Sequence, residues 1–228
     1  YFQFLNTWGS VMWELVKAGG WLMLPLVLCS IFTVAISLER FIRLKKTTIL
    51  PKDLLLNPAQ SVQMVLPKLK QNQDLQATTL GRILEAGYQS KAQGEQFARA
   101  QMEATASQEI GYLEKNINFL GTLSAVAPLL GLLGTVLGII ESFLMIDIGN
   151  SSNPTLMIPG ISKALITTAA GMFIAIPALF AYRYFQRLVQ EYVAELEQQS
   201  TLFHAALFYK QTETVLENHD DVVVKQAS

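Results

Sequence analysis

The sequence predicts an all-α membrane protein with three transmembrane helices and long cytoplasmic helical extensions. Three charge-free runs predict the spans, namely Ala18–Leu38, Asn116–Ile140 and Ala164–Tyr182. Each run is long enough, because about 20 helical residues at about 1.5 Å each cross the hydrocarbon core of a bilayer. Only 15% of the 228 residues are charged and 51% are hydrophobic, whereas an average protein has about 25% charged residues. The apolar residues are concentrated in blocks, which is typical of membrane proteins.

The first residues are interpreted separately from the rest of the chain. Tyr1, Phe2 and Gln3 resemble the remnant of a protease-cleavage linker, and Met12 offers a natural start. We therefore expect residues 1–11 to be a tag or linker remnant and assign residues 12–42 to the first transmembrane helix. Pro25 is expected to kink this helix, because proline removes a backbone hydrogen bond.

The segment between the first two spans, residues 43–115, is predicted to be helical. Three prolines limit the helices of its first part to short lengths. Gln96–Lys115 has no proline and is rich in Ala, Gln and Glu. We expect this stretch to run without a break into the second transmembrane helix, residues 116–148.

The remainder is assigned to a loop at 149–160, a third transmembrane helix at 161–183 and a helical tail at 184–228. Apolar residues recur along the tail at helical spacing, namely Leu188, Tyr192, Leu196, Phe203 and Leu207. Apolar residues on Gln96–Lys115 also need a partner, and they are Phe97, Met102, Ile110 and Leu113. The two stretches are therefore predicted to form a long antiparallel helix pair.

The distribution of Lys and Arg predicts the orientation, because positively charged flanks stay in the cytoplasm. Four such residues follow the first span closely and two follow the third, whereas Glu141–Ser162 has none. This pattern predicts a periplasmic N-terminus, a periplasmic loop at 149–160, and cytoplasmic segments at 43–115 and 184–228.

Small residues mark one face of the second transmembrane helix, at spacings of three and four. The helix-packing candidates from both later spans are Pro128, Gly131, Gly134, Gly138 and Gly171. Thr135 shares the face of the second helix, and Thr168 lies on a comparable face of the third. Spacing leaves two interpretations open. The face is a close helix contact with hydroxyls bonded to their own helix, or it lines a pore or encloses a partner helix.

Lys163 and Glu141 are charged residues near the outer ends of the later spans. A lysine at the bilayer centre costs about 2.5–3.5 kcal/mol on insertion scales. Lys163 therefore either extends to the interface or faces an internal cavity. Glu141 ends the charge-free part of its span and is interpreted as an interfacial residue.

Other functions lack the residues that they need. His204 and His219 have no neighbours at metal-ligand spacing, and no HExxH or GxSxG motif occurs. A net charge of -1 without a basic stripe argues against nucleic-acid binding. We therefore expect no metal, no cofactor and no enzymatic activity, with the lipid bilayer as the surroundings.

The second and third spans resemble the MotA/TolQ/ExbB proton channel family, and its ExbB branch in particular. The resemblance rests on LGTLSAVAPLLGLLGTVLGIIESF, followed by PGISKALITTAAGMFIAIPALFAY. The stretch WELVKAGGWLMLPLVLCSIFTVAISLERF is similar to the first span of the same family. Three predicted spans differ from the four of the MotA branch.

The resemblance implies a homopentamer in the inner membrane of a Gram-negative bacterium, around a pair of single-span ExbD helices. Proton flow would power TonB, which energises outer-membrane transport. Thr135 and Thr168 match the two pore-facing threonines of the family, and the protonated carboxylate belongs to the ExbD-like partner. A TolQ-like subunit of the Tol-Pal envelope system and a passive oligomeric scaffold remain alternatives.

Lys163 departs from the family pattern, because well-known members carry a glutamate near the pore at this position. The lysine inverts the charge, so we do not expect it to accept a proton. It is assigned to the proton pathway with Thr135 and Thr168, and its expected partner is an acidic group of another subunit.

Overall fold

The computed structural model describes residues 17, 19–55, 62–149 and 154–209. Its described residues form helices and no strands, which confirms the predicted all-α class. Three helical stretches are long and apolar enough to cross a membrane, so the three predicted spans are also confirmed. The proposed tag remnant at 1–11 lies outside the described residues.

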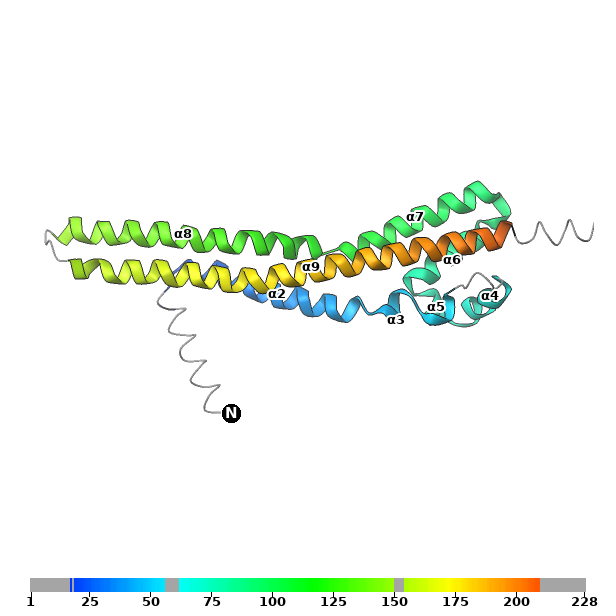
Figure 1. Cartoon of the computed structure of the whole chain (residues 1–228), viewed down its shortest axis with the longest axis horizontal. Coiled ribbons are helices and arrows are strands. Elements are labelled where there is room, and N and C mark those ends of the chain that lie inside the picture. Colours follow the sequence, from blue (N-terminus) through cyan, green and yellow to red (C-terminus); the bar gives the residue numbers. More distant parts are fainter. Residues whose placement is uncertain (1–16, 18, 56–61, 150–153, 210–228) are drawn as a thin grey trace, which may run out of the picture. The chain divides into compact units, whose positions relative to one another are not determined.

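The chain divides into two compact units. Unit 1 comprises residues 1–40 and 116–185, and unit 2 comprises residues 41–115 and 186–228. The longest helix, α9 (Ile158–Phe208), contributes residues to both units. It is the yellow-to-orange ribbon in Figure 1.

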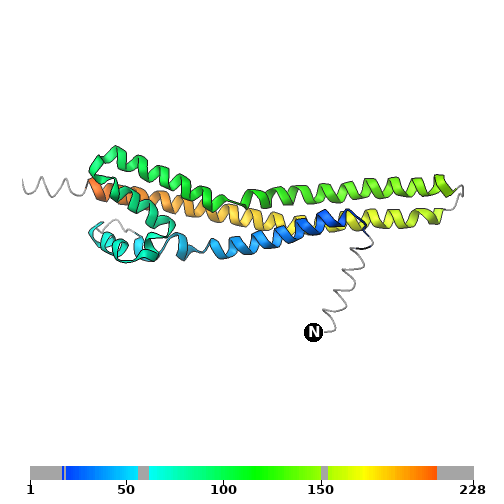
Figure 2. The same ribbon diagram turned by 180° about the vertical axis from the view of Figure 1, so that it is seen from behind.

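Unit 1 contains the apolar helices α2 (Met23–Arg43, up to Arg40), α8 (Ile117–Gly149) and the first part of α9. A short 3-10 helix, η3 (Pro154–Met157), precedes α9. α8 and α9 run side by side in opposite directions in both views (Figures 1 and 2). α2 contacts α8 through an edge-on pair of rings, Phe32 and Phe119, with centroids 6.1 Å apart.

α2 begins later than the charge-free run predicts. Gly20 has a φ of 72°, which most residues avoid, and the helix starts only at Met23. Pro25 consequently lies in the first turn, where the backbone N–H groups have no helical partner. The expected kink at Pro25 is therefore wrong, because the proline removes no hydrogen bond from the helix.

The predicted continuous helix into the second span is also wrong. α7 (Glu95–Glu114) ends at Lys115, whose ψ of 139° is not helical. Asn116 then adopts a φ of 64°, and α8 starts at Ile117. Asparagine tolerates this left-handed conformation better than most residues. The Asn116 amide also donates a hydrogen bond to the Glu39 carboxylate at 3.0 Å, which ties the start of α8 to α2.

Unit 2 consists of shorter helices, α7 and the end of α9. The shorter elements are α3 (Lys46–Ile49), η1 (Lys52–Leu54), α4 (Val62–Gln71), α5 (Gln73–Gln76), α6 (Thr79–Gln89) and η2 (Lys91–Gln93). α6 packs on α7, and its Arg82 forms an ion pair of 2.8 Å with the mostly buried Glu109 of α7.

α7 and the second part of α9 pack in opposite directions, as the sequence predicts. The Tyr209 hydroxyl after the end of α9 donates a hydrogen bond of 2.6 Å to Glu95 at the start of α7. Four of the five predicted apolar residues of the tail are buried, namely Tyr192, Leu196, Phe203 and Leu207. Phe97 was expected to pack in the same pair but is 51% exposed.

The tail also contacts the start of the connector within unit 2. The Tyr192 hydroxyl donates to the Leu44 carbonyl at 3.0 Å. Lys46 forms an ion pair of 2.9 Å with Glu195, and this carboxylate raises the pKa of the lysine above its usual range. Residues before the second span and after the third therefore share one folded body.

Candidate functional site

The contact between α8 and α9 is formed by small residues. On α8 the buried positions recur at spacings of three and four, which places them on one face; they are Ala127, Gly131, Gly134, Gly138 and Ser142. The facing buried positions of α9 are Gly160, Ala164, Thr167, Gly171 and Ala175. Such residues allow two helix backbones to approach closely in a membrane.

The glycines at this contact have no space for a side chain. A Cβ atom at Gly131 would lie 3.0 Å from the Thr167 carbonyl oxygen and 3.1 Å from the Thr168 Cα. At Gly138 it would lie 2.7 Å from the Gly160 carbonyl oxygen. Because these neighbours are backbone atoms, they cannot rotate away, and any larger residue would push the helices apart.

Gly134 and Gly171 belong to the same contact. A Cβ at Gly134 would collide with the Thr167 side chain, and one at Gly171 would lie 2.6 Å from the Ala127 carbonyl oxygen. Pro128, the remaining packing candidate, is only half-buried, whereas the preceding Ala127 is fully buried. The helix contact therefore uses the residue beside the proline.

The two threonines assigned from the sequence have different partners. The Thr168 hydroxyl crosses the contact and donates to the Gly131 carbonyl at 3.0 Å. The Thr135 hydroxyl instead donates to Leu132 of its own helix at 2.6 Å. Both side chains are half-buried in the single chain. Each can therefore present part of its surface to another molecule.

Thr167 is a buried hydroxyl of this contact that is not among the candidates predicted from the sequence. It is 1% exposed, and its hydroxyl donates to the Ala164 carbonyl at 2.9 Å. Its position three residues after Ala164 and four before Gly171 would have placed it on the small-residue face.

Lys163 is paired within the chain. Its ammonium group lies 2.7 Å from the Glu141 carboxylate of α8, so the acidic partner expected from another subunit is present in the chain itself. A pairing signal exists in the sequence, because opposite charges occupy the matching ends of two spans joined by a short loop.

The interface offers hydroxyl groups but no strong proton acceptor. The stretches 117–140 and 164–182 contain no Asp, Glu, His, Lys or Arg. Within the described residues, no group of three or more His, Cys, Asp or Glu side chains could hold a metal ion. Threonine hydroxyls can donate and accept hydrogen bonds, but they do not titrate near neutral pH.

The three apolar helices, two of them packed through glycines around polar hydroxyls, define a multi-pass membrane protein. The chain belongs to the MotA/TolQ/ExbB proton channel family, whose sequence profile matches residues 75–198. This finding confirms the resemblance seen in the spans. The matched region includes both threonines, Glu141 and Lys163.

Individual relatives come from the ExbB and the TolQ branches of the family. An ExbB-like biopolymer transport protein of Synechocystis sp. is 32% identical over 214 residues, 91% of this chain and 84% of that protein. The Tol-Pal system protein TolQ of Haemophilus influenzae is 36% identical over 113 residues, 48% of this chain and 50% of that protein. The biopolymer transport protein ExbB of Salmonella typhimurium is 40% identical over 85 residues, 37% of this chain and 35% of that protein.

Proposed function

We propose that this protein is an ExbB-like subunit of a proton-motive-force-driven complex that energises TonB-dependent transport across the outer membrane. The observation that carries the proposal is the contact between the charge-free stretches of α8 and α9, with Thr135 and Thr168 half-buried beside it. In a homo-oligomer, these hydroxyls line a central channel. Lys163 belongs to the outer end of the same pathway.

Partner proteins supply the titratable group that the two threonine-containing stretches lack. A proton pathway needs a titratable group, and none lies in the two stretches that hold the threonines. An ExbD-like single-span protein with a membrane carboxylate supplies it inside the channel, and a TonB-like protein receives the mechanical work. The homo-oligomer is a pentamer, as implied by the family resemblance.

The proposed site is the bacterial inner membrane, with the N-terminus in the periplasm. Contacts within unit 2 support the topology, because the 43–115 connector and the tail after 184 must lie on the same side to form one body. The excess of Lys and Arg after the first and third spans supports a cytoplasmic location for that side. The loop at 149–160 is then periplasmic.

A TolQ-like role in the Tol-Pal system is the second candidate, favoured by the 36% identity to the Haemophilus influenzae TolQ. Complementation separates the two roles. The gene for this protein, with the gene for its single-span partner, is expected to restore iron-siderophore uptake to an exbB exbD double deletion. Restored detergent resistance in a strain that lacks TolQ and its single-span partner, without restored uptake, would favour the TolQ-like role.

Removing either threonine hydroxyl is expected to impair proton-driven function. Valine is nearly isosteric with threonine, but its side chain cannot form a hydrogen bond. Thr168→Val therefore loses the hydrogen bond to the Gly131 carbonyl. Thr135→Val removes the hydroxyl that is bonded to Leu132, and with it a polar group on the half-buried surface of α8. We expect at least a several-fold loss of iron-siderophore uptake at unchanged yield of the purified complex.

The matched control for this experiment is Thr122→Val. Thr122 also lies on α8, is exposed, and its hydroxyl donates only to Asn118 of the same helix at 3.1 Å. Uptake is expected to stay at the wild-type rate in this variant. Normal uptake in both Thr135→Val and Thr168→Val would contradict the channel role and favour a passive scaffold.

A further inference from the structure

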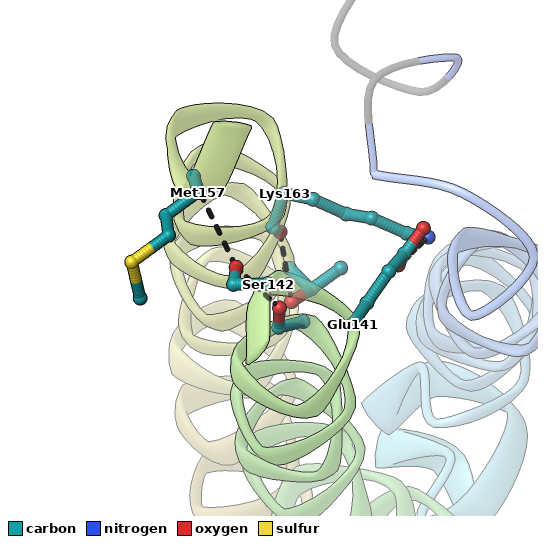
Figure 3. A network of polar contacts seen from close by, with 6 residues as sticks. Glu141, Ser142, Met157 and Lys163 are labelled. Atoms are coloured by element: carbon teal, nitrogen blue, oxygen red, sulfur yellow. Dashed lines mark hydrogen bonds and ion pairs between the residues drawn. The ribbon is translucent and has the colours of Figure 1, made fainter. Parts of the chain in front are cut away.

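The end of α8 and the start of α9 are joined by an ion pair. The Lys163 ammonium donates to the Glu141 Oε2 at 2.7 Å, and Figure 3 shows the two side chains reaching toward each other from different helices. The side chains of Lys163 and Glu141 are 27% and 45% exposed. An unpaired charge is costly in apolar surroundings, so each group lowers the cost of the other.

A second polar contact lies directly beside the ion pair. The hydroxyl of Ser142, the residue after Glu141, lies 2.9 Å from the Gly138 carbonyl and 3.2 Å from the Met157 carbonyl (Figure 3). The Met157 carbonyl immediately precedes α9. The side chains of two successive α8 residues therefore hold this region. Glu141 binds the Lys163 side chain of α9, and Ser142 binds the backbone carbonyl of Met157 just before α9.

The segment before α2 covers the same lysine. A Cβ atom at Gly20 would lie 2.9 Å from the Lys163 ammonium nitrogen and would collide with the adjacent Cε. Gly20 also has a φ of 72°, which disfavours any other residue. The ion pair is thus a point at which α8, α9 and the approach to α2 meet.

The ion pair is the first of a series of contacts between α8 and α9 that ends at Thr168. In order along the two helices, each α8 residue faces one α9 residue. The facing pairs are Glu141–Lys163, Gly138–Ala164, Gly134–Thr167 and Gly131–Thr168. Small residues recur along both helices, so a slide by one turn would again place small residues on small residues. The polar contacts occur only between particular residues, so they distinguish the observed register from such a slide.

We propose that the Glu141–Lys163 ion pair sets the register of α9 on α8, so that the Thr168 hydroxyl meets the Gly131 carbonyl. Lys163 is then a positioning residue, because its charge is needed as the partner of Glu141. Fixing a register is a known use of polar pairs in otherwise apolar helix contacts. The link to transport rests on the proposed function, whereas the register itself does not.

The register can be measured in the assembled complex by the distance between two spin labels. Labels at the exposed positions Leu133 and Met172, in a Cys29→Ser background, report the placement of α9 on α8. The labelled subunits are mixed with an excess of unlabelled subunits, so that few complexes contain two labelled chains. The measured distance is then the one between the two labels of a single chain. Lys163→Met and Glu141→Gln are each expected to shift or broaden the distance distribution.

Reversing both charges provides the decisive comparison. The double variant Glu141→Lys/Lys163→Glu keeps an ion pair, so it is expected to recover the wild-type distance and to exceed both single variants in iron-siderophore uptake. Lys163→Arg is expected to keep the distance, because arginine retains the charge. Arg187→Gln is the control, since Arg187 pairs with Glu191 on the exposed surface of the same helix.

Three results would overturn the proposal. They are an unchanged distance in both single variants, a charge-reversed variant that stays as displaced as the single variants, and an Arg187→Gln shift as large as that of Lys163→Met. The distances are recorded without a proton gradient. A wild-type complex with the expected distance but no proton-driven uptake would therefore count against the proposed function alone.

Discussion

Replacing Gly171 by leucine is expected to disrupt the packing of α9 on α8 and prevent assembly of the complex. A Cβ atom at this position would lie 2.6 Å from the Ala127 carbonyl oxygen and 3.1 Å from the Gly131 Cα. These are backbone atoms of another helix, so the helices must separate to admit the side chain. Forcing bulk into a packed contact costs about 1–3 kcal/mol and occasionally more, and we expect about 3 kcal/mol or more here.

The measurement is the thermal unfolding midpoint of the detergent-solubilised protein, together with its elution volume. Gly111→Leu is the matched control, because Gly111 also lies in a helix but a Cβ atom there would meet no neighbouring group within 4 Å. Leucine is a better helix former than glycine, so the control is expected to gain roughly 0.5–1 kcal/mol. Equal midpoints for the two variants would contradict a tight contact at Gly171.

Phe203→Ala is expected to destabilise unit 2 by about 3–5 kcal/mol, the usual cost of removing a buried phenylalanine ring. Phe203 is 0% exposed, on the part of α9 that packs with α7. The loss combines apolar surface returned to water with the cavity that the ring leaves. Chemical denaturation of the purified protein, followed by the circular dichroism of its helices, measures the change.

Phe97→Ala is the matched control for this variant. Phe97 lies on α7 in the same unit but is 51% exposed, so its removal is expected to cost about 1 kcal/mol or less. If Phe203→Ala unfolds at the same denaturant concentration as Phe97→Ala, the tight burial of Phe203 in unit 2 is contradicted.

The helical class and the three spans could be predicted because they depend on local composition. A backbone in lipid must satisfy its own hydrogen bonds, so a long charge-free run has few options besides a helix. The apolar stripe of the tail was predictable for a similar reason, since Tyr192, Leu196, Phe203 and Leu207 follow helical spacing. Their burial in the structure agrees with that spacing.

Helix ends were predicted less well, because they depend on single backbone conformations. The break after α7 arises from the left-handed conformation of Asn116, and its hydrogen bond to Glu39 connects residues 77 positions apart. The late start of α2 arises from the positive φ of Gly20, which lies against Lys163. Neither contact has a signature in the neighbouring sequence.

At the candidate site, too, some features could be predicted from the sequence and others could not. Sequence spacing by itself determined that Gly131, Thr135 and Gly138 share a face of one helix, because the helical repeat is constant. Only the tertiary structure decided what that face touches, that Thr168 donates to Gly131, and that Lys163 pairs with Glu141. Periodicity describes one helix at a time, whereas the partner of a side chain depends on how a second helix is placed beside it.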